Sequence, residues 1–411
     1  MAVGADFFPE MPEVKGVRIA VVEAGVRYPN RKDLVLFAVD AGAKVAGVYT
    51  KNAFCAAPVH IAKAHMQSIQ ASNLREPIFF LINTGNANAG TGKQGFEAAK
   101  ACCSAVAGQF GVSIERVLPF STGVIGEPLA SDRICSAVPR LESSLSGLCW
   151  KTAAQGIMTT DTRPKGATAQ IEYAGQTITI NGISKGAGMI KPNMATMLCF
   201  IATDANLPQS LLNSLSQELA DKSFNRITID GDTSTNDACM IVASGQAQQV
   251  EISEDDADFP AFKEALTQVY LELAHAIVRD GEGATKFVTI QVEQAATSQE
   301  ALDLAYTIAH SPLVKTALFA SDPNWGRILA ALGRAPIEGL DLDAVRIFLG
   351  DVLLVEQGGR AKTYTEEAGQ AVVDQDHILI RIELARGTVA ETVWTTDFSH
   401  DYVTINAEYR S

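Results

Sequence analysis

Residues 184–204 read Ser-Lys-Gly-Ala-Gly-Met-Ile-Lys-Pro-Asn-Met-Ala-Thr-Met-Leu-Cys-Phe-Ile-Ala-Thr-Asp. The two glycines and the proline precede a small residue, Ala195, then Thr196, and then an apolar run that predicts a buried strand over 197–202. A loop of this composition can take backbone conformations that regular elements exclude. The segment therefore places the hydroxyl of Thr196 at the mouth of a buried strand.

This placement gives Thr196 two alternative interpretations. Its hydroxyl can attack the carbonyl of Ala195, and cleavage of that bond would leave Thr196 with a free α-amine. Such an amine has a pKa of about 7.7–8.0 and suits a general base at neutral pH. A terminal threonine with its own amine is a known activated nucleophile. The alternative is an ordinary loop that enters a core strand.

Apolar runs of strand length alternate with helical patterns on both sides of this segment. The strands expected before it are 17–22, 34–39, 45–49, 77–82 and 117–120, and the helices are 58–72, 95–110 and 132–145. A hairpin is expected over 169–173 and 177–180, with its turn at Ala174-Gly175. The elements expected after it are strands at 197–202 and 287–292 and helices at 209–222 and 259–279.

This alternation predicts an α/β or α+β fold with layered sheets. A length of 411 residues corresponds to two or three domains, or to one large layered body with an appendage. We expect a larger catalytic domain over 1–290 and a smaller α/β domain over 291–411.

The chain is acidic: 33 Lys and Arg face 47 Asp and Glu, a formal net charge of −14. Such a surface repels phosphate backbones and anionic lipid, so we expect neither a nucleic-acid nor a membrane partner. Seven cysteines without a C-x-x-C pair, and no apparent signal peptide, are typical of a cytoplasmic protein. A few Lys or Arg side chains gathered at one site could still bind a small anionic substrate.

We expect no metal and no bound cofactor, because the six histidines are scattered and form no metal-ligand spacing. The glycine-rich run 85–93 fails as a phosphate loop: Ala87 takes the first glycine position, and Gln94 stands where a hydroxyl must reach magnesium. The acidic run 230–237 lacks the central glycine and closing glutamate of a calcium loop. It is expected to be a structural turn.

Three other polar segments could complete an active site. Thr122 and Gly123 follow a strand, so a hydroxyl and an N–H could face a developing oxyanion; the alternative is a strand-to-helix turn. Residues 158–165 bunch hydroxyls with charge, which is typical of caps and turns. Glu282 stands between two glycines and is expected to be an exposed carboxylate able to meet a substrate ammonium.

The run 185–198 resembles the signature of the ornithine acetyltransferase family, the glutamate N-acetyltransferases of arginine biosynthesis. Eight further blocks resemble that family in order, over nearly the whole chain: Asn52-Ala-Phe-Cys-Ala-Ala-Pro58, Asn83-Thr-Gly-Asn-Ala-Asn-Ala-Gly90, Ser121-Thr-Gly-Val-Ile-Gly126, Met158-Thr-Thr-Asp-Thr162, Gly231-Asp-Thr-Ser-Thr-Asn236, Arg279-Asp-Gly-Glu-Gly-Ala-Thr-Lys-Phe287, Asp322-Pro-Asn-Trp-Gly-Arg327 and Asn406-Ala-Glu-Tyr-Arg-Ser411. The one visible departure is Ser411, where the family often has threonine. The hydroxyl is kept.

The resemblance implies self-cleavage between Ala195 and Thr196, which gives an α chain (1–195) and a β chain (196–411). Thr196 would then take the acetyl group from N-acetyl-L-ornithine and pass it to L-glutamate, with Thr122 and Gly123 as the oxyanion hole. The implied substrate contacts are Thr159, Lys185, Thr196, Glu282, Asn406 and Ser411. This agrees with their chemistry, since a lysine can meet a carboxylate and a glutamate an ammonium.

The resemblance also implies a helix–sheet–sheet–helix sandwich laid out as in N-terminal-nucleophile enzymes, with a smaller C-terminal α/β domain, and an α2β2 heterotetramer. Acetyl-CoA stays open as a second donor, because some members use it and others do not. Two other functions stay open. One is a self-processed aminopeptidase or amidohydrolase with the same threonine nucleophile; the other is an uncleaved binding protein for amino acids.

Overall fold

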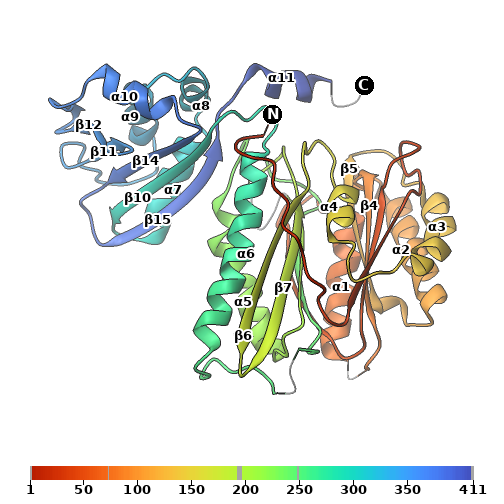
Figure 1. Ribbon diagram of the computed structural model, residues 1–411. Coiled ribbons are helices and arrows are strands. Elements are labelled where there is room, and N and C mark those ends of the chain that lie inside the picture. The colour runs from red at the N-terminus through yellow and green to blue at the C-terminus, as the bar shows by residue number, and fades with distance from the viewer. Residues whose placement is uncertain (1, 73, 192–196, 248–249, 409–411) are drawn as a thin grey trace.

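A computed structural model describes residues 2–72, 74–191, 197–247 and 250–408. Two stacked sheets with helices on their outer faces form the larger part of the molecule, and a third sheet with its own helices stands beside them (Figure 1). Ala195, Thr196 and Ser411 lie outside the described residues.

The first sheet lies on the side of the molecule where α2 (Gly92–Phe110) and α3 (Ser131–Ser143) form the outer layer (Figure 1). The side chains of its strand β2 (Leu34–Val39) are all buried, because the sheet is covered on both faces. Its strands in spatial order are β1 (Val17–Val22), β2 (Leu34–Val39), β4 (Ile78–Asn86) and β5 (Val117–Val124). Only the β4–β5 pair is parallel. The covering helices are α2 (Gly92–Phe110) and α3 (Ser131–Ser143).

The second sheet carries α5 (Gln209–Lys222) and α6 (Phe259–Arg279) on its outer face, where their apolar stripes pack against it. Its strands in spatial order are β3 (Lys44–Tyr49), β9 (Ala238–Ala243), β8 (Leu198–Thr203), β7 (Gln176–Lys185) and β6 (Lys165–Tyr173). The helices are α5 (Gln209–Lys222) and α6 (Phe259–Arg279). Within this sheet β8 and β9 run parallel, so their starts lie at one edge.

The inner faces of the two sheets meet in an aromatic core. Phe120 of the first sheet and Phe200 of the second pack edge to face, with ring centroids 5.0 Å apart. Trp150 of α4 (Trp150–Gly156) closes the same cluster against Phe37. Helix α1 (Ala57–Ala71) packs against the edge strands β5 and β3, one from each sheet. The expected layer order of helix, sheet, sheet and helix is therefore confirmed.

The third sheet has a hydrophobic core of its own. Its strands in spatial order are β13 (Gly359–Arg360), β12 (Val352–Glu356), β11 (Arg346–Leu349), β14 (His377–Glu383), β10 (Phe287–Ala295) and β15 (Val389–Thr396). Its helices are α7 (Ser298–Ala309), α8 (Pro312–Phe319), α9 (Trp325–Gly333) and α10 (Glu366–Val373). The boundary expected between residues 290 and 291 falls inside β10, so the division into 1–290 and 291–411 stays a prediction.

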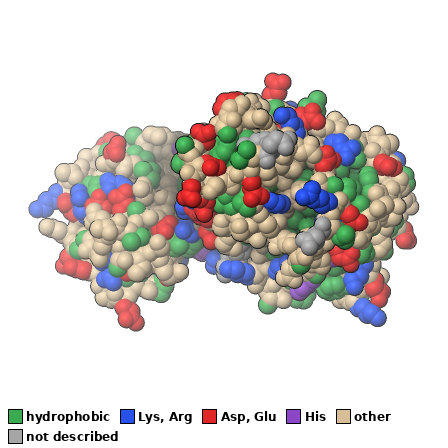
Figure 2. Space-filling model, turned by 90° about the horizontal axis from the view of Figure 1, so that it is seen from below, with side chains coloured by type: hydrophobic (Ala, Val, Ile, Leu, Met, Phe, Trp, Pro, Cys, Tyr) green, Lys and Arg blue, Asp and Glu red, His purple; other side chains and the backbone are tan. Residues whose placement is uncertain are grey.

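The last helix, α11 (His400–Ala407), follows the third sheet and reaches back over the end of the two-sheet part (Figure 1). Short 3-10 turns, Ile114–Arg116 and Phe224–Arg226, precede β5 and follow α5. On the face drawn in Figure 2, Lys and Arg side chains are interspersed with Asp and Glu. Across the residues that the structure describes, no helix has the length and apolarity needed to cross a membrane.

Candidate active site

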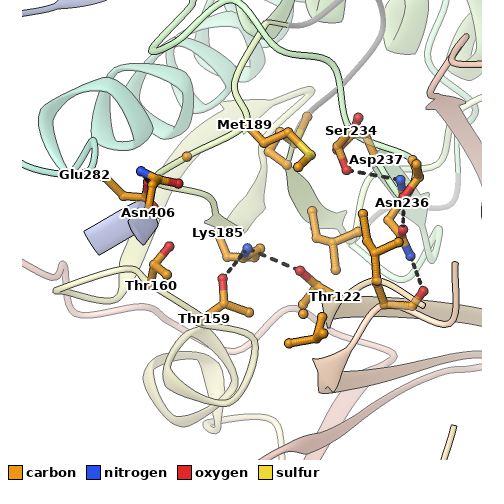
Figure 3. A pocket seen from close by; sticks show the side chains of 18 residues that line it. Thr122, Thr159, Thr160, Lys185, Met189, Ser234, Asn236, Asp237, Glu282 and Asn406 are labelled. Atoms are coloured by element: carbon orange, nitrogen blue, oxygen red, sulfur yellow. Dashed lines mark hydrogen bonds between the residues drawn. The ribbon is translucent and has the colours of Figure 1, made fainter. Parts of the chain in front are cut away.

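A cavity of about 270 Å³ opens where β5 of the first sheet meets the ends of β7 and β8 of the second (Figure 3). Loops on both sheets, the turn after α6 and helix α11 complete its wall. The candidate residues Thr122, Gly123, Thr159, Lys185, Glu282 and Asn406 all line this cavity. Met197 and Leu198, which directly follow Thr196 in the sequence, line it as well.

Thr122 and Gly123 lie within β5, which continues to Val124, so they do not follow the strand as expected, and the alternative of a strand-to-helix turn at these two residues is not observed. The β4–β5 pairing is irregular at this point, because Asn86 faces both Thr122 and Val124. Gly123 has φ +134°, and a Cβ there would lie 2.3 Å from the carbonyl carbon of Gly85. Only glycine allows the two backbones to approach so closely.

Lys185 ends β7 and directs its amine toward the hydroxyls of two threonines (Figure 3). Its Nζ donates to Thr159 Oγ1 at 2.7 Å and to Thr122 Oγ1 at 3.2 Å. Burial lowers the pKa of Lys185, and the neighbouring carboxylate of Asp161 opposes that shift. Because the oxygen of Thr122 accepts from Lys185, its own hydroxyl hydrogen is available for another acceptor in the cavity.

Asp161 is the centre of a buried charge network behind Lys185. Its Oδ1 lies 2.6 Å from Lys165 Nζ and accepts the N–H of Gly186 at 2.7 Å. Its Oδ2 accepts the N–H of Thr159 at 2.9 Å and lies 3.9 Å from Lys185 Nζ. Burial alone would raise the pKa of Asp161, but the charges of Lys165 and Lys185 and the Gly186 N–H outweigh it and lower the pKa.

The network continues to Asp280 at the end of α6. Lys165 Nζ lies 2.5 Å from Asp280 Oδ2, which also accepts the N–H of Thr162 at 3.0 Å. Two carboxylates and two ammonium groups thus balance each other inside the protein, which is the condition for burying charges at acceptable cost. Sequence reasoning did not single out Asp161, Lys165 or Asp280, because their burial depends on segments that are far apart in the chain.

Glu282 lies in the turn after α6 and is only 7% exposed, so the expectation of an exposed carboxylate is wrong. Asn406 of α11 covers it and donates from Nδ2 to Glu282 Oε2 at 2.7 Å. The loop before the expected cleavage site packs on the other side, where a Cβ at Gly188 would lie 2.4 Å from the same oxygen. Glycine at 188 therefore makes room for the carboxylate.

The acidic run 230–237 is a turn, as expected, but it also contributes to the cavity. Asp230 accepts the N–H groups of Met189 at 2.6 Å and Ile190 at 2.9 Å, which fastens the loop that leads to the expected cleavage site. Asn236 donates to the backbone oxygens of Ala87 and Ser121 and so joins the two sheets. Residues 234–237 line the cavity. The apolar run directly after them forms strand β9, which we did not expect, although such a run is typical of a buried strand.

Among the described residues, no group of three or more His, Cys, Asp or Glu side chains is arranged to hold a metal ion. The chemistry that the described wall offers is a hydroxyl and an N–H on β5, a buried ammonium beside them, and a carboxylate with an amide at the other end. This set can hold a zwitterionic small molecule and stabilise negative charge on an acyl oxygen.

Comparison with known proteins identifies a family and several relatives that this chain resembles. A model of the ArgJ family matches residues 18–411. Proteins from Pseudomonas syringae pv. tomato and Pseudomonas fluorescens, each named arginine biosynthesis bifunctional protein ArgJ, are 56% and 54% identical to this chain over the full length of both partners. A crystal structure of arginine biosynthesis bifunctional protein ArgJ from Bacillus halodurans is 39% identical, with a TM-score of 0.50; the match covers 52% of this chain and 100% of that one.

Proposed function

The chain belongs to the ArgJ family, and on that premise we propose that it is a bifunctional acetyltransferase of arginine biosynthesis. It moves the acetyl group of N-acetyl-L-ornithine to L-glutamate, and it also acetylates glutamate with acetyl-CoA. The observation that carries the proposal is the convergence of Thr122, Gly123, Lys185 and Glu282 on one cavity, although they are far apart in sequence.

Transfer proceeds in two halves on Thr196. Its hydroxyl attacks the acetyl carbon of the donor while its α-amine takes the hydroxyl proton. The negative charge on the acetyl oxygen is held by the Thr122 hydroxyl and the Gly123 N–H. The amine then returns the proton to the departing nitrogen of ornithine. In the second half the amine of glutamate attacks the acetyl ester, and the same groups act in reverse order.

The two ends of the cavity fit the two ends of the substrates. The buried amine of Lys185 meets the α-carboxylate that ornithine and glutamate share, with the Thr159 hydroxyl beside it. Glu282, with Asn406, meets the ammonium of ornithine at the other end. Ser411, expected to touch substrate, lies outside the described residues. The acidic surface is no obstacle, because one buried cation suffices to bind a carboxylate.

The proposal includes self-cleavage between Ala195 and Thr196, assembly of the α and β chains into an α2β2 heterotetramer, and a cytoplasmic location. The solved Bacillus halodurans chain supports the cut, because its full length corresponds to about half of this chain, the size of one product. A division into a catalytic domain over 1–290 and a C-terminal domain over 291–411 is part of the same proposal.

A donor and acceptor panel tests the function. Purified enzyme is given N-acetylornithine or acetyl-CoA, each with and without glutamate, and both N-acetylglutamate and free acetate are measured. We expect N-acetylglutamate from either donor, and little acetate when glutamate is absent. Acetate release at the same rate with and without glutamate would indicate the alternative, an amidohydrolase with the same nucleophile. No turnover of either donor would refute the proposed function.

A further inference from the structure

Self-cleavage raises a chemical requirement that acetyl transfer does not. During transfer the free α-amine of Thr196 can accept the hydroxyl proton. Before cleavage that nitrogen is part of the peptide bond to Ala195, and an amide nitrogen is not a base. The uncut chain must therefore take the first proton with a different group.

Asp237 is a candidate for this group, because it lies beside the described residues that follow Thr196 in the chain. It directly precedes β9, whose first residue, Ala238, pairs with Leu198 and donates its N–H to the oxygen of Met197 at 3.1 Å. Asp237 thus lies beside the residue that follows Thr196 in the chain. Its side chain lines the cavity (Figure 3), and the residue is only 2% exposed.

The two oxygens of this carboxyl differ in their surroundings. The carboxyl accepts hydrogen bonds from the Ser234 hydroxyl and from the backbone N–H of Met197. Its Oδ2, however, is a buried oxygen without a hydrogen-bond partner among the described atoms. A buried polar atom without a hydrogen bond lowers the stability of the folded protein, so its presence in a cavity indicates a functional role.

The other titratable groups in the described wall are already engaged. Lys185 is a donor to Thr122 and Thr159 and sits against a carboxylate that favours its charged form. Glu282 is bound to Asn406 and lies on the far side of Lys185 from Asp237 in Figure 3. Of the two carboxyls that line the described wall, Asp237 is the one that directly precedes Ala238, the residue hydrogen-bonded to Met197.

We propose that Asp237 is the general base and acid of self-cleavage, an inference that rests on the proposed function. As Thr196 Oγ bonds to the carbonyl carbon of Ala195, its proton passes to the Asp237 carboxylate. The Asp237 acid gives that proton to the Thr196 nitrogen as the C–N bond breaks, leaving an ester and a free amine. Water then hydrolyses the ester: its hydroxyl goes to the Ala195 carbon and its proton to Oγ.

The surroundings of Asp237 suit a base. Burial raises the pKa of Asp237 well above its usual value, although the Ser234 hydroxyl, the charge of Lys185 and the Met197 N–H each act to lower it. From the side of α1, the Cys55 thiol interacts electrostatically with the same carboxylate. A carboxylate with a raised pKa accepts protons more readily than an exposed one, and general bases work best when their pKa lies near the working pH.

The test follows cleavage of freshly translated full-length chain. Cell-free synthesis is stopped, and loss of the 43.7 kDa band is timed between pH 5 and 9. We expect the wild-type rate to rise with pH as Asp237 loses its proton. Asp237→Asn keeps the shape and should slow cleavage by on the order of 10²–10⁴ and remove the pH dependence. The matched control is Asp232→Asn, an exposed carboxyl of the same segment, which should cleave like wild type.

A second variant keeps the test valid if Asp237→Asn fails to fold. Ser234→Ala removes a hydrogen bond that lowers the pKa of Asp237, so the midpoint of the pH profile should move upward. An unmoved midpoint in Ser234→Ala, or cleavage of Asp237→Asn at the wild-type rate, would overturn the role of Asp237. A wild-type chain that never cleaves would instead refute self-cleavage itself.

Discussion

At the scale of single residues, the site depends on how one buried lysine is held. Lys185 reaches two hydroxyls on its cavity side and one carboxylate behind it. Asp161 contributes more than charge, because it also accepts N–H groups from Thr159 and Gly186, the backbones on either side of the lysine. The same carboxylate therefore favours the charged form of Lys185 and also holds the backbone on either side of it in place.

Asp161→Asn should destabilise the fold by about 3–5 kcal/mol, because it leaves buried ammonium groups without their partner. Since the pKa of Asp161 is lowered in the fold, its stabilisation is present at neutral pH and is lost as the pH falls through the folded value, in acid. Urea unfolding at pH 7 measures the change. The matched control is Glu97→Gln in the exposed helical pair with Lys93, which should cost at most about 1 kcal/mol. Equal costs for the two variants would refute the network.

Thr122→Ala should lower turnover by on the order of 10²–10³, because it removes one of the two donors that we propose for the acetyl oxygen. Thr122→Ser keeps the hydroxyl that Lys185 contacts and should retain most of the turnover. The measurement is the initial rate of N-acetylglutamate formation at saturating substrates. A rate for the alanine variant equal to that of the serine variant would remove Thr122 from the oxyanion hole.

At the scale of elements, the site lies where regular pairing is interrupted. The irregularity between β4 and β5 places Thr122 and Gly123 at the cavity wall. The cost of this arrangement is a glycine that cannot be replaced, since a Cβ at Gly123 would meet backbone atoms of Gly85 and Asn86. Backbone atoms cannot move aside as a flexible side chain can.

Gly123→Ala should therefore destabilise the fold by more than about 2 kcal/mol, measured by denaturant unfolding rather than by activity. Gly108→Ala, on the exposed face of α2 where a Cβ meets nothing within 4 Å, should instead stabilise it by about 0.5–1 kcal/mol. Both substitutions add one methyl group. If both substitutions changed the free energy of unfolding in the same direction, the close approach of β4 and β5 would not explain the effect of Gly123→Ala.

Local pattern predicted some elements to the residue and could not predict others. Helices α5 and α6 have the expected bounds, because an apolar stripe at helical spacing is a local signal. The extension of β5 to Val124 depends on its irregular pairing with β4, which no local pattern shows. Glu282 was expected to be exposed because its flanking glycines indicate a turn; the side chain that covers it, Asn406, comes from a distant helix.

At the scale of the whole molecule, the site joins parts that have separate cores. Glu282 follows α6 of the two-sheet part, whereas Asn406 lies on α11, after the third sheet. The cavity wall is therefore complete only when α11 packs over the turn at Glu282 (Figure 1). In the proposed function, the C-terminal segment takes part in substrate binding through this contact.

Asn406→Ala should raise the KM for N-acetylornithine more than it lowers kcat, because it removes the hydrogen bond that holds Glu282, the carboxylate that we propose to meet the ornithine ammonium. Loss of one hydrogen bond to a charged group corresponds to about 1.5–3 kcal/mol. The control is Val403→Ala on the same helix, an exposed position that does not line the cavity. Identical kinetics for the two variants would remove α11 from the binding site.

Passage of the acetyl group through Thr196 can be followed by intact mass spectrometry. Enzyme is mixed with N-acetylornithine, without glutamate, and quenched in acid. We expect two fragments, 1–195 and 196–411, with the mass of one acetyl group added to the second and lost again when glutamate is supplied before the quench. Thr196→Ala should remain one uncut, unacetylated chain of 43.7 kDa. Normal fragments from that variant would rule out Thr196 as the cleaving residue, and full transfer without an acetylated fragment would rule out an acetyl-Thr196 intermediate.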